Sequence, residues 1–392
     1  MYFGEICLYL SQNQNVMYRP FVYGTSVSGD NFTDRVVETS RIKKNFSAGI
    51  NTILISPRRL GKTSLVKKVI SEFDNSDPVI VFMDIYDCRS AQDFYLRYSQ
   101  SILKALSSTT ERLMENAKEF LGRLAPRISV SPDMTSEYSL SIGISHKDID
   151  PDEILTLPER IAEKKGLHIV VCIDEFQQIG DFPDSLTFQK RLRGIWQHQQ
   201  RTSYCLFGSK KHMMEKIFHS KRMPFYIFGD TIYLGTVPEA DWISYICSRF
   251  RTAGITISEE HAAEICRKVE CYSSYVQQLA WNVMVNANSI VTDADVNNGM
   301  EFLVSQNEPL YVAKIENLSS YQLNLLRAIC DGVNSGFTSE SILKKWNLGS
   351  KSNVARIRSS LIEKELIDKR DGKLYISDPV LRFWLTKYLQ KL

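Results

Sequence analysis

The stretch from Ile53 to Ile70, ILISPRRLGKTSLVKKVI, constrains the fold of this chain more than any other. An apolar run ends at Ser56, a loop follows, and Gly61-Lys62-Thr63 opens a segment whose apolar residues recur at helical spacing. Strand, loop and helix in this order are typical of a P-loop, in which backbone N–H groups at a helix N-terminus bind phosphate oxygens. The pattern therefore predicts a nucleotide-binding α/β domain with a parallel sheet.

Each residue of the predicted P-loop has a chemical role. Lys62 is expected to reach the β- and γ-phosphates, and the hydroxyl of Thr63 is expected to ligate Mg²⁺. Ser56 stands where the motif usually has its first glycine, but a small serine can also turn the chain out of a strand. The alternative is a Gly-Lys-Thr sequence that only begins a helix. The predicted nucleotide contacts are Ser56, Pro57, Arg58, Arg59, Leu60, Gly61, Lys62, Thr63 and Ser64.

A second apolar run, from His168 to Ile173, ends in the acidic pair Asp174-Glu175. This is the form of a Walker B strand, in which the aspartate holds Mg²⁺ and the glutamate polarises the attacking water. An acidic pair can also be a solvated loop after a core strand. Because both motifs occur in the expected order at the ends of two buried strands, we predict that a nucleotide and Mg²⁺ bind here.

The rest of the chain alternates in type. Further strands are predicted at 79–86, 203–209 and 231–234, a β-hairpin insertion at 128–144, and a long helix at 91–124. Buried strands that alternate with helices indicate a parallel sheet covered on both faces. Residues 238–302 are helical in pattern.

The last 75 residues predict a winged helix. Three helical patterns at 320–330, 339–346 and 350–363 precede Asp371-Gly372, a strong hairpin turn signal between two apolar-rich arms. The predicted organisation is an N-terminal extension at 1–20, a P-loop core at 21–237, a helical lid at 238–317 and a winged helix at 318–392.

The sequence resembles the prokaryotic P-loop ATPase family first described in archaea, which is grouped with the STAND branch near AAA+ proteins. The resemblance covers residues 20–392 and implies an ASCE-type core, a lid, a winged helix and adenine as the base. It rests on these stretches: Phe32 to Arg35, Pro57 to Thr63, Cys172 to Phe176, Phe207 to Ser209 with Met213-Met214, Tyr275 to Leu279, and Asp378 to Trp384.

The resemblance also assigns roles and exposes two departures. It implies that Ser209 is a polar sensor near the γ-phosphate, although a serine there could also cap the next helix. The family often has an arginine after a glycine ahead of the fifth strand, where this chain has Gly229-Asp230, with Arg222 nearby. It usually has a proline ahead of Tyr275, where this chain has Tyr272-Ser273-Ser274. A missing arginine finger predicts slow hydrolysis and favours a switch over a motor.

The winged helix carries a net charge of +6, with 13 Lys and Arg against 7 Asp and Glu in residues 318–392. If it binds DNA, its third helix should contact the duplex through outward side chains, and its hairpin should touch phosphates. The predicted contacts are Lys351, Arg356, Lys369, Arg370 and Lys373. The alternative is a basic surface that is solvated, or that docks on the core or on a partner protein.

The remaining sequence features indicate no further functional site. The 8 cysteines are scattered and the 6 histidines are dispersed, which argues against a zinc site and favours reduced thiols in the cytoplasm. No run reaches the ~20 apolar residues of a membrane span, so we expect no membrane partner.

Together these features favour a regulatory NTPase that hydrolyses ATP slowly with Mg²⁺ and couples nucleotide state to the winged helix. One alternative is a DNA-binding regulator in which ATP is a structural ligand. The other is a protein-interaction scaffold whose partner supplies an arginine, and assembly into a homo-oligomer is a separate possibility.

Overall fold

The computed structural model describes residues 19–74, 77–107, 119–120, 128–132, 138–142 and 150–389. The chain forms two compact units. The sheet unit consists of Arg35–Arg58 and Lys62–Gly235, and the helical unit consists of the described residues up to Asp34, of Arg59–Gly61 and of Thr236 onward.

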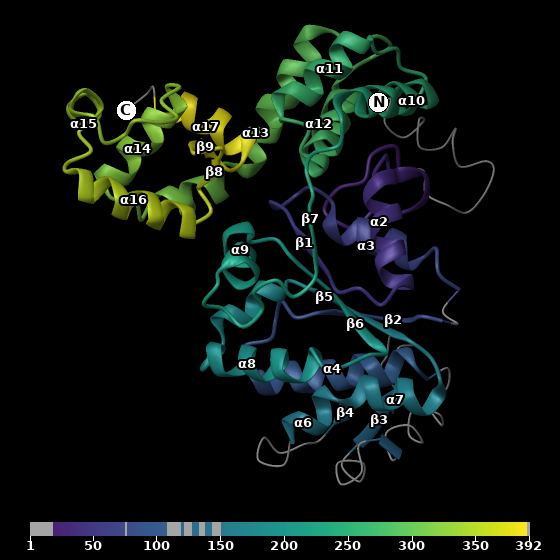
Figure 1. Ribbon diagram of the computed structural model, residues 1–392. Helices are drawn as coiled ribbons and strands as arrows, with labels where there is room; N and C mark the ends of the chain where they lie inside the picture. Colours follow the sequence, from purple (N-terminus) through teal and green to yellow (C-terminus); the bar gives the residue numbers. More distant parts are fainter. Residues whose placement is uncertain are drawn as a thin grey trace. The chain divides into compact units, whose positions relative to one another are not determined.

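A five-stranded parallel sheet forms the middle layer of the sheet unit, in the order β2-β5-β6-β1-β7 (Figure 1). The three central strands are buried along their whole length, as the apolar runs predict. The predicted parallel-sheet fold class is confirmed. The strands are β1 (Thr52–Ile55), β2 (Val79–Asp84), β5 (Ile169–Asp174), β6 (Thr202–Gly208) and β7 (Asp230–Tyr233).

Helices cover both faces of this sheet. Helices α2 and α3 lie on one face, and α4, α7 and α8 lie on the other (Figure 1). Helix α3 begins at Lys62 and buries Leu65, Val66 and Val69, the apolar residues that recur at helical spacing. The helices of this unit are α2 (Val36–Ser47), α3 (Lys62–Ile70), α4 (Ala91–Ala105), α6 (Pro151–Leu155), α7 (Leu157–Lys165), α8 (Ser185–Trp196) and α9 (Lys211–His219), with the 3-10 helix η3 (Phe176–Asp181).

Two segments differ from the sequence patterns. Helix α4 ends at Ala105, and most of the stretch predicted to continue it to 124 lies outside the described residues. Helix α6 was not predicted, although Asp150 accepts the N–H of Asp152 and Pro151 occupies the first turn, which are ordinary helix-start signals.

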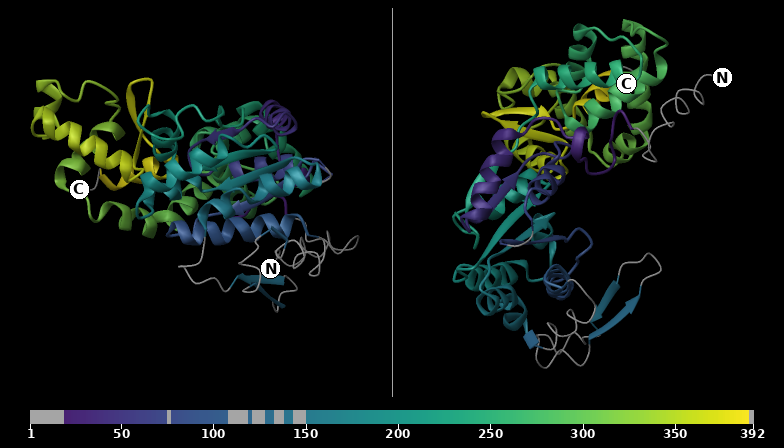
Figure 2. Two further views of the ribbon diagram at one scale, coloured as in Figure 1. Left: turned by 60° about the horizontal axis from the view of Figure 1, so that its bottom comes forward. Right: turned by 90° about the vertical axis from the view of Figure 1, so that its right-hand side faces the viewer.

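An antiparallel pair lies outside the five-stranded sheet, in the stretch where alternation predicts a hairpin (Figure 2). It consists of β3 (Ile128–Pro132) and β4 (Tyr138–Ile142), and residues 133–137 between them lie outside the described residues.

The helical unit contains four helices in the lid region and a winged helix after them. Side chains from both regions belong to one hydrophobic cluster, in which Tyr311 and Trp384 lie with ring centroids 5.7 Å apart. The elements are α10 (Glu239–Thr252), α11 (Glu259–Lys268), α12 (Ser273–Asn286), α13 (Asp293–Ile315), α14 (Ser320–Cys330), α15 (Glu340–Lys345), α16 (Lys351–Glu363), β8 (Ile367–Arg370), β9 (Lys373–Ile376) and α17 (Pro379–Leu389).

Local sequence explains where these elements begin and turn. Thr292 with Asp295, and Ser319 with Gln322, form capping boxes at the starts of α13 and α14. Asp371 and Gly372 have φ values of 49° and 80°, the left-handed conformations of a type I′ turn between β8 and β9. The predicted winged helix is confirmed. Among the described residues, no helix is long and apolar enough to cross a membrane.

Candidate functional site: a P-loop at the sheet edge

The order of the strands brings the candidate site together. Strand β6 lies between β1 and β5, and all three run in the same direction. Their carboxyl ends therefore meet at one edge of the sheet, where open α/β sheets bind ligands. Ser56, Asp174 and Ser209 each lie at or directly after one of these ends.

The P-loop folds around the side chain of Lys62. The Lys62 ammonium donates to the carbonyl oxygen and hydroxyl of Ser56, both at 3.3 Å, and to the carbonyl oxygen of Pro57 at 3.0 Å. Lys62 is only 6% exposed and lies at the first turn of α3. The ammonium is therefore held where the backbone N–H groups of the helix start also favour an anion.

Ser56 fits the first position of the loop. Its side chain is buried, its hydroxyl donates to the carbonyl oxygen of Pro57, and its φ is not positive. The loop needs glycine at Gly61 instead, where φ is +85°. The other predicted contacts differ in exposure: Leu60 and Ser64 are buried, Pro57 and Arg59 are half-buried, and Arg58 is exposed.

Thr63 and Asp174, the two predicted Mg²⁺ ligands, lie in direct contact. The Thr63 hydroxyl donates to Asp174 Oδ2 at 2.6 Å. Burial raises the pKa of Asp174 to about 6, while the hydrogen bond from Thr63 acts in the opposite direction. The charges that raise this pKa further are those of Glu175 and Asp84, both negative.

The side-chain oxygen atoms of Thr63 and Asp174 are suitable ligands for Mg²⁺. A hydroxyl and a carboxylate oxygen are the hard ligands that Mg²⁺ prefers, and Mg²⁺ commonly takes its remaining ligands from phosphates and water. A buried carboxylate surrounded by negative charge is stabilised by a cation. Sequence reasoning missed Asp84, which pairs in register with Asp174 at the end of β2. The signal was present, because an apolar strand ends in aspartate there as well.

Glu175 is held by two polar side chains that meet at one oxygen. The Ser209 hydroxyl donates to Glu175 Oε2 at 2.9 Å, and the side-chain amide of Gln177 donates to the same oxygen. Gln177 is 2% exposed and was not predicted. Its contact with Gly208 is so close that a Cβ at Gly208 would lie 1.7 Å from Gln177 Oε1. The arrangement fixes the carboxylate of the expected general base.

Arg59 of the loop belongs to a chain of contacts inside the helical unit. Its carbonyl oxygen accepts the N–H of Ser274 at 3.1 Å, and its guanidinium lies 4.4 Å from the ring centroid of Tyr275. The Tyr275 hydroxyl donates to Asp378 Oδ2 at 2.5 Å. Asp378 in turn accepts the N–H groups of Val380 and Leu381 through Oδ1. A P-loop residue is thus linked by two side chains to the first turn of α17.

Asp230, at the position where the family often has an arginine, has a structural role in this chain. Asp230 forms an ion pair with Arg41 and accepts the side-chain amide of Asn45 at 2.8 Å. These contacts lower the pKa of Asp230 and fasten α2 to the start of β7. Arg222, the substitute suggested by the sequence, is exposed between α9 and β7.

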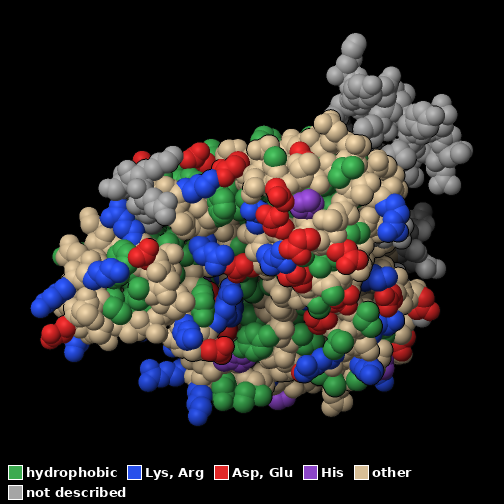
Figure 3. Space-filling view, turned by 90° about the horizontal axis from the view of Figure 1, so that it is seen from above, with side chains coloured by type: hydrophobic (Ala, Val, Ile, Leu, Met, Phe, Trp, Pro, Cys, Tyr) green, Lys and Arg blue, Asp and Glu red, His purple; other side chains and the backbone are tan. Residues whose placement is uncertain are grey.

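The winged helix presents most of its predicted basic contacts to solvent. Val354, Ile357 and Leu361 are buried, so Lys351 and Arg356 lie on the exposed side of α16. In Figure 3, Lys and Arg side chains project at the left, where α15 and α16 lie in Figure 1.

Arg370, also predicted to contact DNA, has partners within the chain as well. Its guanidinium donates to the Tyr272 hydroxyl at 3.3 Å, pairs with Asp368 at 3.4 Å and lies over the ring of Tyr375. The hairpin pattern could not reveal this, because Tyr272 lies almost a hundred positions earlier in the chain.

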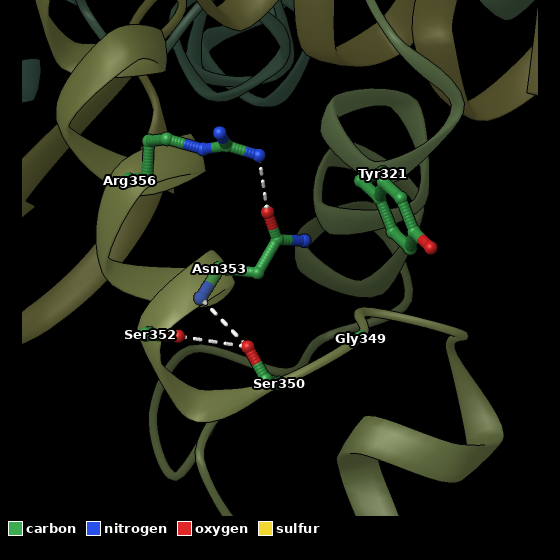
Figure 4. Close-up of a pocket in the computed structure, with 6 residues that line it drawn as sticks. All are labelled: Tyr321, Gly349, Ser350, Ser352, Asn353 and Arg356. Carbon is green, nitrogen blue, oxygen red and sulfur yellow. Dashed lines mark hydrogen bonds between the residues drawn. The ribbon is translucent and has the colours of Figure 1, made fainter.

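A pocket of 510 Å³ opens at the start of α16 (Figure 4). Ser350 accepts the N–H of Asn353 and contacts the hydroxyl of Ser352, while Arg356 donates to the side chain of Asn353. Tyr321 and Gly349 complete the lining.

Comparisons with known proteins agree with this architecture. Residues 309–387 match the family model described as "Probable winged helix domain". None of the curated proteins compared with the sequence matches it. A Walker-type ATPase of Pyrococcus abyssi is 15% identical, with a TM-score of 0.66, over 94% of this chain and 99% of that one.

A second solved structure, the Orc2 protein of Aeropyrum pernix in ADPNP and ADP complexes, is 14% identical, with a TM-score of 0.55. It covers 95% of this chain and 96% of its own. At these identities the likeness establishes the fold, that of a P-loop NTPase core followed by a winged helix. The resemblance stated from the sequence is confirmed at this level.

Proposed function

We propose that this chain is a regulatory NTPase that binds ATP with Mg²⁺, hydrolyses it slowly, and couples its nucleotide state to the winged helix. Lys62 and the loop backbone bind the phosphates, Thr63 and Asp174 hold the metal, and Glu175 orients and activates water. When bound, Mg²⁺ supplies charge neutralisation at the phosphates.

Slow turnover follows from the charges at the site. An arginine finger increases the rate of hydrolysis by roughly 10³ to 10⁵. The residue at the expected position is Asp230, which is engaged with Arg41. Arg59 is likewise occupied by Tyr275. A switch that stays in its ATP state is consistent with this arrangement.

The observation that carries the regulatory part is the chain of contacts from Arg59 through Tyr275 to Asp378. Nucleotide that orders the loop would change the position of Arg59, and the Tyr275 hydroxyl would transmit this to the N-terminus of α17. The element with two positions is α17, whose first turn Asp378 caps.

Tyr275→Phe tests this coupling, because it keeps the ring beneath Arg59 and removes the bond to Asp378. We expect a non-hydrolysable ATP analogue to change the amide hydrogen exchange of Val380 and Leu381 in the wild type, and to leave it unchanged in Tyr275→Phe. The matched control is Tyr245→Phe, which also removes a buried hydroxyl of the lid region, one bonded to Gln277. An equal response in all three proteins would remove Tyr275 from the coupling.

A second candidate function is DNA binding by the winged helix. The exposed Lys351, Arg356, Lys369 and Lys373 are suitable phosphate contacts, and Arg356 lies beside the pocket at the start of α16. Four phosphate contacts predict that the logarithm of affinity falls with the logarithm of salt concentration at a slope of about −3.6.

The DNA reading is checked by titrating duplex DNA at several salt concentrations. Lys369→Gln with Lys373→Gln should reduce the magnitude of the slope by about 1.8. The control is Lys165→Gln with Lys221→Gln, two exposed lysines of the sheet unit. A slope that the winged-helix substitutions leave unchanged would favour a docking surface instead.

A further inference from the structure

Cys266 and Cys271 form a thiol pair at the C-terminal end of α11. The N–H of Cys271 donates to the carbonyl oxygen of Cys266 at 2.9 Å, and the N–H of Glu270 donates to that of Arg267 at 3.2 Å. With Val269 as the C-cap, these two bonds define a Schellman motif. This motif brings the side chains at its two outer positions together, usually as an apolar contact. Here both positions are cysteine.

The two thiols are neighbours in this turn and differ in access. The Schellman motif places these two side chains next to each other. Cys266 is fully buried, whereas Cys271 is half-buried at the edge of the hydrophobic cluster. One sulfur can therefore meet a small reagent from solvent while the other lies directly behind it.

The surroundings of Cys271 favour reactivity in one respect and oppose it in others. The neighbouring Cys266 thiol lowers the pKa of the Cys271 thiol, while burial and the carboxylates of Glu239 and Glu270 act in the opposite direction. The Cys271 thiol and burial together raise the pKa of Cys266. Ionisation is therefore favoured at Cys271, the more exposed of the two thiols.

The backbone at this turn is also unusual. Glu270 and Cys271 both have positive φ, 48° and 55°. Residues other than glycine, asparagine and aspartate rarely adopt this conformation. The Schellman motif requires it at only one of these positions. The second left-handed residue is Cys271 itself.

We propose that Cys266 and Cys271 are a dithiol site that hydrogen peroxide oxidises to an intramolecular disulfide. The Cys271 thiolate attacks a peroxide oxygen, the O–O bond breaks, and protonation of the leaving oxygen gives water and a sulfenic acid at Cys271. Cys266 then attacks that sulfur and expels a second water, so two thiols are oxidised as one hydrogen peroxide is reduced to two waters.

A second cysteine pair in the sheet unit provides an internal contrast. Cys172 and Cys205 are register partners on β5 and β6, and both are completely buried. Burial raises the pKa of Cys172 well above that of a free thiol. Proximity is therefore common to both pairs, but only the pair on α11 combines it with access.

The site adjoins a structural anchor of the helical unit. Tyr272, the next residue, donates its hydroxyl to the carbonyl oxygen of Ser377 at 3.0 Å and accepts from Arg370. Closing the disulfide would fix the turn that positions Tyr272. The dithiol pair therefore lies next to a contact between the lid region and the winged helix.

The test treats the reduced full-length protein with hydrogen peroxide, blocks remaining thiols by alkylation under denaturing conditions, and maps peptides by mass spectrometry. We expect a disulfide within the 266–271 peptide that dithiothreitol reverses, with Cys172 and Cys205 recovered as alkylated thiols. Cys266→Ser should leave Cys271 to accumulate as sulfenic acid, trapped by dimedone, whereas Cys271→Ser should leave Cys266 reduced.

Several results would overturn the proposal. Sulfinic acid at Cys271 in the wild type without a disulfide would show that Cys266 does not resolve the intermediate. Equal oxidation of the α11 and sheet pairs would show that access does not select the site. The wild-type measurement tests the proposal by itself. A serine variant that fails to fold would therefore not leave the proposal untested.

Discussion

At the scale of single residues, Asp174 is a buried carboxylate whose neighbours are also acidic. Its pKa in the folded chain is about 6 against an ordinary 3.8, so the folded state binds a proton more tightly than the unfolded state does. Metal-free stability therefore falls as pH rises from about 4 to 6, and the unfavourable contribution is fully present above that range. The shift corresponds to at most about 3 kcal/mol.

The substitution Asp174→Asn separates the destabilising effect of this buried charge from its role in binding Mg²⁺. At pH 7.5 without metal, we expect the substitution to raise the free energy of unfolding by roughly 1 to 3 kcal/mol, and near pH 4 to leave it almost unchanged. The stabilisation that Mg²⁺ and nucleotide confer should be lost. Urea unfolding at the two pH values measures both effects, with Asp184→Asn, at an exposed position of the sheet unit, as control. Destabilisation of the metal-free protein at pH 7.5 would contradict this explanation.

Whether a site residue could be predicted depended on how close in sequence its partners lie. Lys62, Thr63 and Asp174 could be named because their motifs are short and lie at strand ends. Gln177 could not, since a glutamine two positions after an acidic pair is unremarkable until Glu175 is seen to accept its amide. The contact of Arg370 with Tyr272 could not be predicted, because that hydroxyl comes from a distant segment.

At the scale of elements, the end of β6 is packed against the start of η3. Gly208 lies there because no Cβ fits beside Gln177, whose amide holds Glu175. The sequence Phe207-Gly208-Ser209 contained this information only in part. It marked a strand end and a polar residue, but the close approach of η3 depends on the fold.

Gly208→Ala is expected to displace Gln177 and thereby free the Glu175 carboxylate. Hydrolysis should fall by about tenfold or more, since a positioned general base contributes roughly 10² to 10⁴ in rate. ATP affinity should change little, because the P-loop is untouched. Gly194→Ala in α8, where a Cβ meets nothing within 4 Å, is the matched control. Phosphate release that remains at the wild-type rate in Gly208→Ala would show that Gln177 does not position Glu175.

The elements themselves were largely predictable, and their order was not. Apolar runs give β1, β5 and β6 because these strands are buried on both faces, and capping residues give the starts of α13 and α14. The placement of β6 between β1 and β5 follows from tertiary packing, which no local pattern contains. The end of α4 at Ala105 likewise has no clear signal in the sequence.

At the scale of the whole molecule, the two units share one continuous segment of chain. The P-loop begins and ends in the sheet unit, while Arg59–Gly61 belong to the helical unit. The loop that we propose to respond to nucleotide is therefore covalently part of both. The proposed function depends first on this loop being a working nucleotide site, with Ser56 as a tolerated variant of the usual glycine.

The most direct measurement is steady-state phosphate release from ATP with Mg²⁺, together with ATP binding, for the wild type, Lys62→Ala and Glu175→Gln. We predict slow turnover that both substitutions abolish. Affinity should be weakened roughly ten- to a hundredfold in Lys62→Ala, which loses a charge-assisted hydrogen bond, and retained in Glu175→Gln. Unchanged ATP affinity in Lys62→Ala, or equal turnover in wild type and Glu175→Gln, would contradict the assignment of this site.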